Sequence, residues 1–185
     1  MLLLAMLLLA SLLCGSQSGS SAVQEETGTA AAPVSGHPFK VSITTGGGLY
    51  GPVRSRFKVG EDIPISISLN NTGDKPAKYC ISTILLQNRP QLKRDGQLLP
   101  YLSGMVKLVD TGEFIQRCED SERRRFYELQ PKQTRIVDWF TIGRRTIDWY
   151  GELPAGHYEL VLMRRIQCCQ GPMDESNKVT FEIVP

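Results

Sequence analysis

Cys118 and His157 are the residues of this chain whose types could form a catalytic pair. A cysteine thiolate beside a histidine base is a common nucleophile. The structural interpretation of each residue is stronger, because cysteines favour disulfides in an oxidising compartment and His157 begins an alternating segment as a solvent-facing residue. The sequence also contains none of the GxSxG, HExxH and phosphate-loop motifs. We therefore predict no catalytic residue, no cofactor and no enzymatic activity, with a hydrolase as the weakest alternative.

Acidic residues cluster at Glu119–Glu122 and at Asp174-Glu175. A calcium site needs several oxygen ligands that converge from one loop, and neither cluster has that spacing. The CxxC spacing of zinc sites is also missing from the sequence. We interpret both clusters as solvated loops and predict no metal site.

Arginines occur in three short runs, Arg123–Arg125, Arg144-Arg145 and Arg164-Arg165. Acids such as Glu122 and Asp148 lie close by in the sequence, so local ion pairs are the simplest interpretation. If folding gathers the runs on one face, they could instead grip an anionic glycan or phosphate group. The whole chain has 21 Lys and Arg against 19 Asp and Glu. This balance predicts no attraction to nucleic acid or to an anionic membrane.

The two tryptophans are candidates for core packing or for recognition. In an alternating strand Trp139 would face the core with Val137 and leave Phe140 on the other face. Trp149-Tyr150 precedes Gly151 in a segment that resembles a loop. An exposed aromatic residue there could anchor a partner. The sequence therefore predicts a partner contact at these residues: Trp149, Tyr150, Arg144 and Arg145.

Five cysteines are present, Cys14, Cys80, Cys118, Cys168 and Cys169. Without Cys14, which lies in the leader, four remain, and an even number in an exported protein predicts two disulfides. Adjacent cysteines bond only with a distorted backbone. Cys80 and Cys118 are therefore expected to pair with one each of Cys168 and Cys169, and both pairings stay open. Loops this long would stabilise the fold by roughly 2–5 kcal/mol per disulfide.

The N-terminus resembles a secretory leader. Leu2–Leu13 is an apolar run of the length of a signal-peptide core, shorter than the roughly 20 residues of a spanning helix. Cleavage after Ser16 would release a mature chain. Alternatively, Leu12–Ser16 resembles the bacterial lipobox, with Cys14 lipidated, although Leu13 stands where a small residue is usual. We predict a signal peptide over 1–16 and a protein that is periplasmic or extracellular, with membrane attachment only through the leader or a lipid on Cys14.

Two further regions follow the leader. Residues 17–36 are rich in small and polar residues and contain no aromatic residue, which predicts a flexible linker. From 37 to 185 the dominant hydrophobic period is two, which predicts one β domain. Asp95-Gly96 between Leu92–Arg94 and Gln97–Leu99 predicts a tight hairpin with a type I′ turn. The expected strands lie at 39–44, 63–70, 79–84, 92–94, 97–99, 105–109, 135–142, 157–162 and 178–183, with a short helical turn at 121–128.

This pattern of eight or nine strands with short connections predicts an all-β fold, an antiparallel β-sandwich. The segment Phe57–Ile65, with Gly60-Glu61 before a hydrophobic strand, and the turn Asn70–Gly73 resemble exported bacterial immunoglobulin-like domains. Leu129–Pro131 and Leu153–Leu160 are similar to strand boundaries of the same domains. A bacterial proteinase-inhibitor family shares this layout. The resemblance implies an immunoglobulin-like sandwich.

Three functions are compatible with the sequence. The first is a non-enzymatic binding or scaffold module of the bacterial cell envelope, with an envelope or extracellular protein as the expected partner. The second is a proteinase inhibitor that inserts an exposed loop, Gly143–Gly151 or Gly46–Arg56, into a protease cleft. A hydrolase is the third.

Overall fold

The computed structural model describes residues 36–82, 87–105, 125–143, 149–167 and 171–185. The predicted signal peptide and nearly all of the predicted linker lie outside these ranges. So do Cys14, Cys118, Cys168, Cys169, Arg144 and Arg145. In the part of the chain that is described, no helix is long and apolar enough to cross a membrane.

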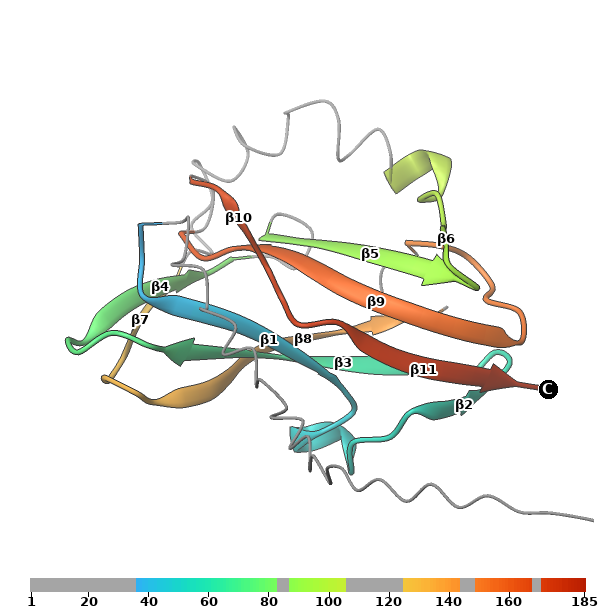
Figure 1. Ribbon diagram of the computed structural model, residues 1–185, viewed down its shortest axis with the longest axis horizontal. Helices are drawn as coiled ribbons and strands as arrows, with labels where there is room; N and C mark the ends of the chain where they lie inside the picture. The colour runs from blue at the N-terminus through green and yellow to red at the C-terminus, as the bar shows by residue number, and fades with distance from the viewer. Residues whose placement is uncertain (1–35, 83–86, 106–124, 144–148, 168–170) are drawn as a thin grey trace, which may run out of the picture. The chain divides into compact units, whose positions relative to one another are not determined.

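One layer of the fold is a three-stranded antiparallel sheet. Its strands are β1 (Phe39–Thr45), β3 (Ile63–Asn71) and β8 (Thr134–Ile142), with β3 in the centre (Figure 1). In β1 and β3 apolar side chains alternate with polar ones, and the apolar set is buried. This alternation places one face of the sheet on the core and the other toward solvent.

The second layer is a larger sheet in the strand order β2-β11-β9-β5-β6. Its neighbours are antiparallel except for β2 and β11, which pair in parallel. Strands β5, β9 and β11 run side by side in Figure 1, and a short β10 pairs with the end of β9. The bounds are β2 (Arg56–Lys58), β5 (Asn88–Arg94), β6 (Gln97–Leu98), β9 (Gly156–Arg165), β10 (Met173–Glu175) and β11 (Val179–Val184).

A two-stranded sheet of β4 (Ala77–Ile81) and β7 (Arg125–Leu129) completes the described strands. The segment predicted as a helical turn at 121–128 is therefore partly wrong, because residues 125–128 belong to β7. The hairpin prediction is confirmed, since Asp95 and Gly96 both adopt positive φ, 49° and 82°, between β5 and β6. Strands β2, β7 and β10 were not predicted, because segments of three to five residues leave too few positions for a clear alternation.

The core is one continuous hydrophobic cluster that receives side chains from both larger sheets. Ile65 and Ile67 of β3 are fully buried, as are Leu160 and Leu162 of β9. Burying one such side chain is worth about 1.5–3 kcal/mol. Aromatic pairs join the strands within and across the sheets, including Phe39–Tyr79, Phe57–Phe181 and Tyr158–Phe181. The all-β, mainly antiparallel sandwich predicted from the sequence is confirmed.

The free edge of β1 is closed by a side chain. Asn177, from the segment between β10 and β11, accepts a hydrogen bond from the Ile43 backbone N–H at 2.7 Å and donates one to the Ile43 carbonyl at 3.1 Å. The amide thus imitates a neighbouring strand at this position. Such covering of an edge is a known defence against unwanted strand pairing.

Trp149 and Tyr150 belong to the interior, which corrects the prediction of a partner contact there. Trp149 is 1 % exposed, and Tyr101 packs against both rings with centroid distances of 5.4 and 5.5 Å. The Tyr150 hydroxyl donates to the Pro90 carbonyl and accepts from the Leu92 N–H at 3.0 Å. The Tyr150 hydroxyl thus binds the backbone of β5, which sequence spacing alone does not reveal.

Tyr150 provides a prediction for alkaline pH. Burial raises the pKa of its phenol far above the ordinary value of 10.0, and the neighbouring Tyr101 adds to the shift. Because the folded-state pKa is the higher one, the stabilisation is complete below about pH 10 and is lost as the pH rises further. We expect the free energy of unfolding to fall above about pH 10. In Tyr150→Phe, urea titrations at several pH values should give a shallower decline, and an unchanged slope would contradict this assignment.

Candidate binding surface

The described residues offer two surfaces to consider, and the first lies on β8. Trp139 is 41 % exposed, whereas Phe140 and Ile142 are buried. The prediction that Trp139 faces the core is therefore wrong. The register between β3 and β8 shifts at Ile67/Ser68, so that Val137 has no partner on β3. This β-bulge breaks the alternation and turns the Trp139 ring outward.

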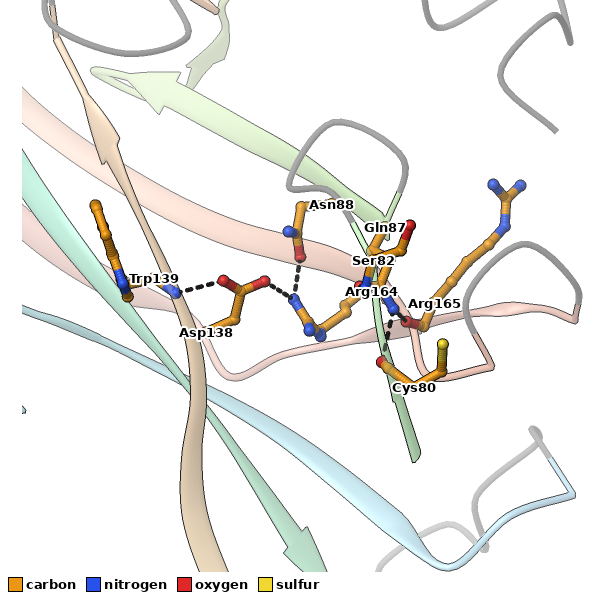
Figure 2. A network of polar contacts seen from close by, with 8 residues as sticks. All are labelled: Cys80, Ser82, Gln87, Asn88, Asp138, Trp139, Arg164 and Arg165. Atoms are coloured by element: carbon orange, nitrogen blue, oxygen red, sulfur yellow. Dashed lines mark hydrogen bonds and ion pairs between the residues drawn. The ribbon is translucent and has the colours of Figure 1, made fainter. Parts of the chain in front are cut away.

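Asp138 takes the inward position that the alternation would assign to an apolar residue. Its Oδ2 accepts a hydrogen bond from Arg164 Nη1 at 2.9 Å, and its Oδ1 accepts one from the Trp139 backbone N–H at 2.8 Å. Asn88 Oδ1 accepts a second bond from Arg164 Nη1 at 2.8 Å. Figure 2 shows the carboxylate between the two donors, with the Trp139 ring on the opposite side of β8. The Asp138 carboxylate thus links the backbone of β8 at Trp139 to the buried guanidinium of Arg164.

Arg164 continues the inward face of β9 and is fully buried. Its Nε and Nη2 find no hydrogen-bond partner among the described residues. Burial lowers the pKa of the guanidinium, and Asp138 opposes that shift. The interpretation of Arg164 as part of a surface grip for an anionic partner is therefore wrong. Its ionic partner is Asp138, 26 residues away in the chain, not a neighbouring acid.

The segment before β2 folds over the outer face of the three-stranded sheet and meets Trp139. It contains a short 3-10 helix η1 (Gly48–Tyr50). The ring centroids of Tyr50 and Trp139 lie 4.8 Å apart, and a Cβ at Gly48 would touch the Ile136 side chain. Val53, in the same segment, is 63 % exposed. We call the exposed set Tyr50, Val53, Ile136 and Trp139 the Trp139 surface.

Glycine is required where the segment 46–56 turns back onto the sheet. Gly46 has a φ of +81°, and a Cβ on it would lie 2.5 Å from the Pro52 carbonyl oxygen. The Ser66 hydroxyl donates to the Gly47 carbonyl at 3.3 Å, and the Arg54 N–H donates to the Thr45 carbonyl at 3.0 Å. The segment therefore lies down on the sheet at both of its ends and brings Tyr50 to Trp139.

We expect Gly46→Ala to displace this segment. The comparison variant is Gly51→Ala, which has nearly the same φ of +80° but open space around a Cβ. Gly51 combines its positive φ with a ψ of −162°, a region that is essentially restricted to glycine. Holding alanine there costs about 1–3 kcal/mol, so Gly51→Ala should lose about that much stability. Gly46→Ala should lose about twice as much because it also clashes with Pro52. Urea unfolding would measure both, and equal losses would show that the close approach is unimportant.

The second surface is a polar groove of about 440 Å³ on the larger sheet. His157 lines it and lies opposite Glu182 in the pairing of β9 and β11, with Arg56 on the other side of Glu182. Cys118, the other half of the considered catalytic pair, lies outside the described residues. Among the residues whose placement is described, no group of three or more His, Cys, Asp or Glu side chains is arranged to hold a metal ion. The groove is open and its side chains are those of an ordinary solvated sheet face.

Of the four cysteines predicted to form disulfides, Cys80 is the one that lies within the described residues. It is buried in β4 and is disulfide-bonded. Cys118, Cys168 and Cys169 lie outside the described residues, so the pairing and the number of disulfides stay predictions. Near Cys80, the Gln87 side chain donates to the Cys80 carbonyl at 2.9 Å and to the Arg165 carbonyl at 3.1 Å, which ties β4 to the end of β9 (Figure 2).

Sequence reasoning placed the recognition residues at Trp149 and Tyr150 and missed Tyr50, Val53 and Ile136. A signal for Tyr50 is present in the sequence, since the run Gly46–Gly48 and Gly51 surround it and indicate an irregular backbone. The outward turn of Trp139 has no comparable signal. It depends on a bulge and on an arginine in another strand.

Comparison with known proteins adds little to these observations. No protein-family model matches the chain, and no curated protein matches it. A solution structure of the CARDB domain of a Pyrococcus furiosus protein is similar with a TM-score of 0.34 and 10% sequence identity, over 80% of this chain and 94% of that one.

Proposed function

We propose that this protein is a non-enzymatic binding module that recognises its ligand with the Trp139 surface. The observation that carries the proposal is the exposed, mutually packed pair of Trp139 and Tyr50 beside Val53 and Ile136. Large apolar side chains gathered on an exposed face are typical of interaction sites, and tryptophan and tyrosine are the residues that most often dominate binding energy. The apolar leader suggests that the module works outside the cytoplasm, in the cell envelope or the medium.

The construction of the site supports this role. The Trp139 ring packs against the Tyr50 ring, and the Asp138 carboxylate accepts a hydrogen bond from the Trp139 backbone N–H at the bulge. A ring that is packed before binding loses less conformational entropy when the ligand arrives.

A proteinase inhibitor is the less favoured alternative. An inhibitory loop has to project into a protease cleft, but the segment 46–56 lies against its own sheet through Gly47 and Thr45. In the second loop considered, Gly143–Gly151, Trp149 is buried, and residues 144–148 lie outside the described ranges. A panel of proteases at micromolar protein would test the alternative directly.

Photo-cross-linking would test the proposed function whatever the ligand is. A photoreactive residue at Val53 should give a discrete adduct with the native ligand in the source cells, because the exposed Val53 side chain lies by Gly47 in the segment that carries Tyr50 to Trp139. The same residue at Phe126, which is 68 % exposed on β7, should give none. Trp139→Ala should abolish the Val53 adduct. An adduct that forms equally with Trp139→Ala, or no adduct at Val53, would contradict the proposal.

A further inference from the structure

We infer that the ligand of the Trp139 surface is an uncharged glycan chain. This inference rests on the proposed function and concerns the chemistry of the outer face of the three-stranded sheet, beside the Trp139 surface. The argument has three parts: the charge of that face, its hydroxyl groups and its aromatic rings.

The outward positions of the three strands carry little charge. Strand register places alternate residues of β1, β3 and β8 on this face. Lys40 is the one charged side chain among these outward positions of the three described strands, although charged residues make up 22% of the chain. The outward residues are Lys40, Ser42, Thr44, Pro64, Ser66, Ser68, Asn70, Thr134, Ile136, Trp139 and Thr141. An anionic ligand would meet a single cation here, so the face fits an uncharged one.

Hydroxyl groups dominate the same positions. The hydroxyls of Thr44 and Ser66 are used internally, on the carbonyls of Gly46 and Gly47. The hydroxyls of Ser42, Ser68 and Thr134 have no hydrogen-bond partner in the part of the chain described, and none of these residues is buried. We call these three residues the hydroxyl floor. A hydroxyl both donates and accepts, and so does a sugar hydroxyl, which makes the two complementary without any charge.

The aromatic rings of Trp139 and Tyr50 lie next to the hydroxyl floor. Ser68 lies opposite Ile136 and Ser66 lies opposite Trp139, so the rings and the floor occupy neighbouring rows of one sheet. The C–H groups of a pyranose ring carry partial positive charge and are attracted to the electron-rich face of tryptophan or tyrosine. A glycan could therefore lay an apolar ring face on the aromatic pair and its hydroxyls on the floor.

A protein partner fits this composition less well. The centres of protein interfaces are depleted in serine, and serine, threonine and valine are rare among the residues that dominate binding. On this face serine and threonine occupy most outward positions, and the apolar part is confined to the four residues of the Trp139 surface.

Affinity electrophoresis of the full chain would test the inference. The probes are gels that contain a neutral glucan, a neutral galactomannan or, for comparison, the anionic polysaccharide alginate. We expect retardation in at least one neutral gel, little changed between low and high salt because no ion pair is involved. Trp139→Ala should weaken the apparent affinity by roughly tenfold or more, and Tyr50→Ala by several-fold. Phe126→Ala removes a more exposed ring from β7 and should leave the affinity unchanged.

Two variants distinguish binding through the hydroxyl floor from binding through the positive charge of Lys40. Ser68→Ala should weaken retardation in the neutral gel, whereas Lys40→Ala should not. Retardation only in alginate and lost in Lys40→Ala would overturn the inference, as would equal retardation of the wild type and Trp139→Ala or no retardation in any neutral gel. If the Val53 adduct forms and depends on Trp139 while every neutral glycan fails, the glycan inference falls and the proposed function stands. If neither the adduct nor glycan binding depends on Trp139, both fall.

Discussion

Asp138→Ala is expected to lower the free energy of unfolding by about 3–5 kcal/mol, the usual cost of leaving a buried charge without its partner. Arg164 is fully buried, and its bond to Asp138 is the one described contact with a carboxylate, since Asn88 supplies only a neutral oxygen. The substitution also uncovers the Trp139 N–H. Urea unfolding at neutral pH with disulfides intact would measure the loss.

The exposed pair Arg56–Glu182 provides the matched control. Its charged atoms are 3.5 Å apart and both side chains are largely in water. Glu182→Ala should cost less than about 1 kcal/mol. The double variant Asp138→Leu with Arg164→Met replaces the buried pair by apolar side chains and should recover most of the stability. A loss below about 1 kcal/mol in Asp138→Ala would show that the pair contributes little.

The same variant should also change the Trp139 surface. In a Trp149→Phe background Trp139 is the remaining tryptophan, so its fluorescence reports on this surface alone. We expect Asp138→Ala to alter acrylamide quenching of Trp139, because the carboxylate no longer fixes the strand at the bulge. The double variant should not restore the original quenching even where it restores stability, since leucine cannot accept the Trp139 hydrogen bond.

Asn71→Ala is expected to destabilise the fold by about 3 kcal/mol. The Asn71 side chain is fully buried and donates to the carbonyls of Lys75 and Leu129 at 2.8 and 2.9 Å. Its Oδ1 also accepts from the Gly73 N–H at 3.0 Å. Each of the three hydrogen bonds has a net contribution of about 1 kcal/mol, which gives the expected loss of about 3 kcal/mol.

Asn70→Ala is the matched control for this residue. Asn70 is the adjacent asparagine on the outer face of β3, opposite Lys40, and is not buried. Its replacement should change the free energy of unfolding by less than about 0.5 kcal/mol. Similar losses for the two variants in urea unfolding would contradict the role assigned to Asn71.

The pattern of the sequence was sufficient for the fold class. The isoleucines of β3 and the leucines of β9 repeat every second residue, and a two-residue period has one structural solution, a strand with one buried face. Asp95-Gly96 likewise permitted the hairpin to be placed exactly, because positive φ at consecutive residues is a local property. The turn after Asn71 follows from local rules too, since Thr72 and Gly73 favour a turn, but the bond from Asn71 to the Leu129 carbonyl does not.

Prediction failed where a residue's position depends on a distant partner. Trp149 is a candidate for core packing or for a partner contact by its place before Gly151, and the packing against Tyr101 decides for the core. Arg164 was grouped with surface arginines because charged residues are almost never fully buried unless paired, and its partner Asp138 lies in another strand.

The sequence by itself determined the class of fold, the strand pattern and an apolar leader, since each follows from composition and from periods of a few residues. Only the tertiary structure decided which aromatic residues are available for recognition. Trp139 faces solvent because a bulge shifts β8 by one residue and because Asp138 turns inward to the Arg164 guanidinium. A one-residue shift in register exchanges the two faces of a strand. The ion pair between β8 and β9 joins residues far apart in the chain, so the local sequence does not predict it.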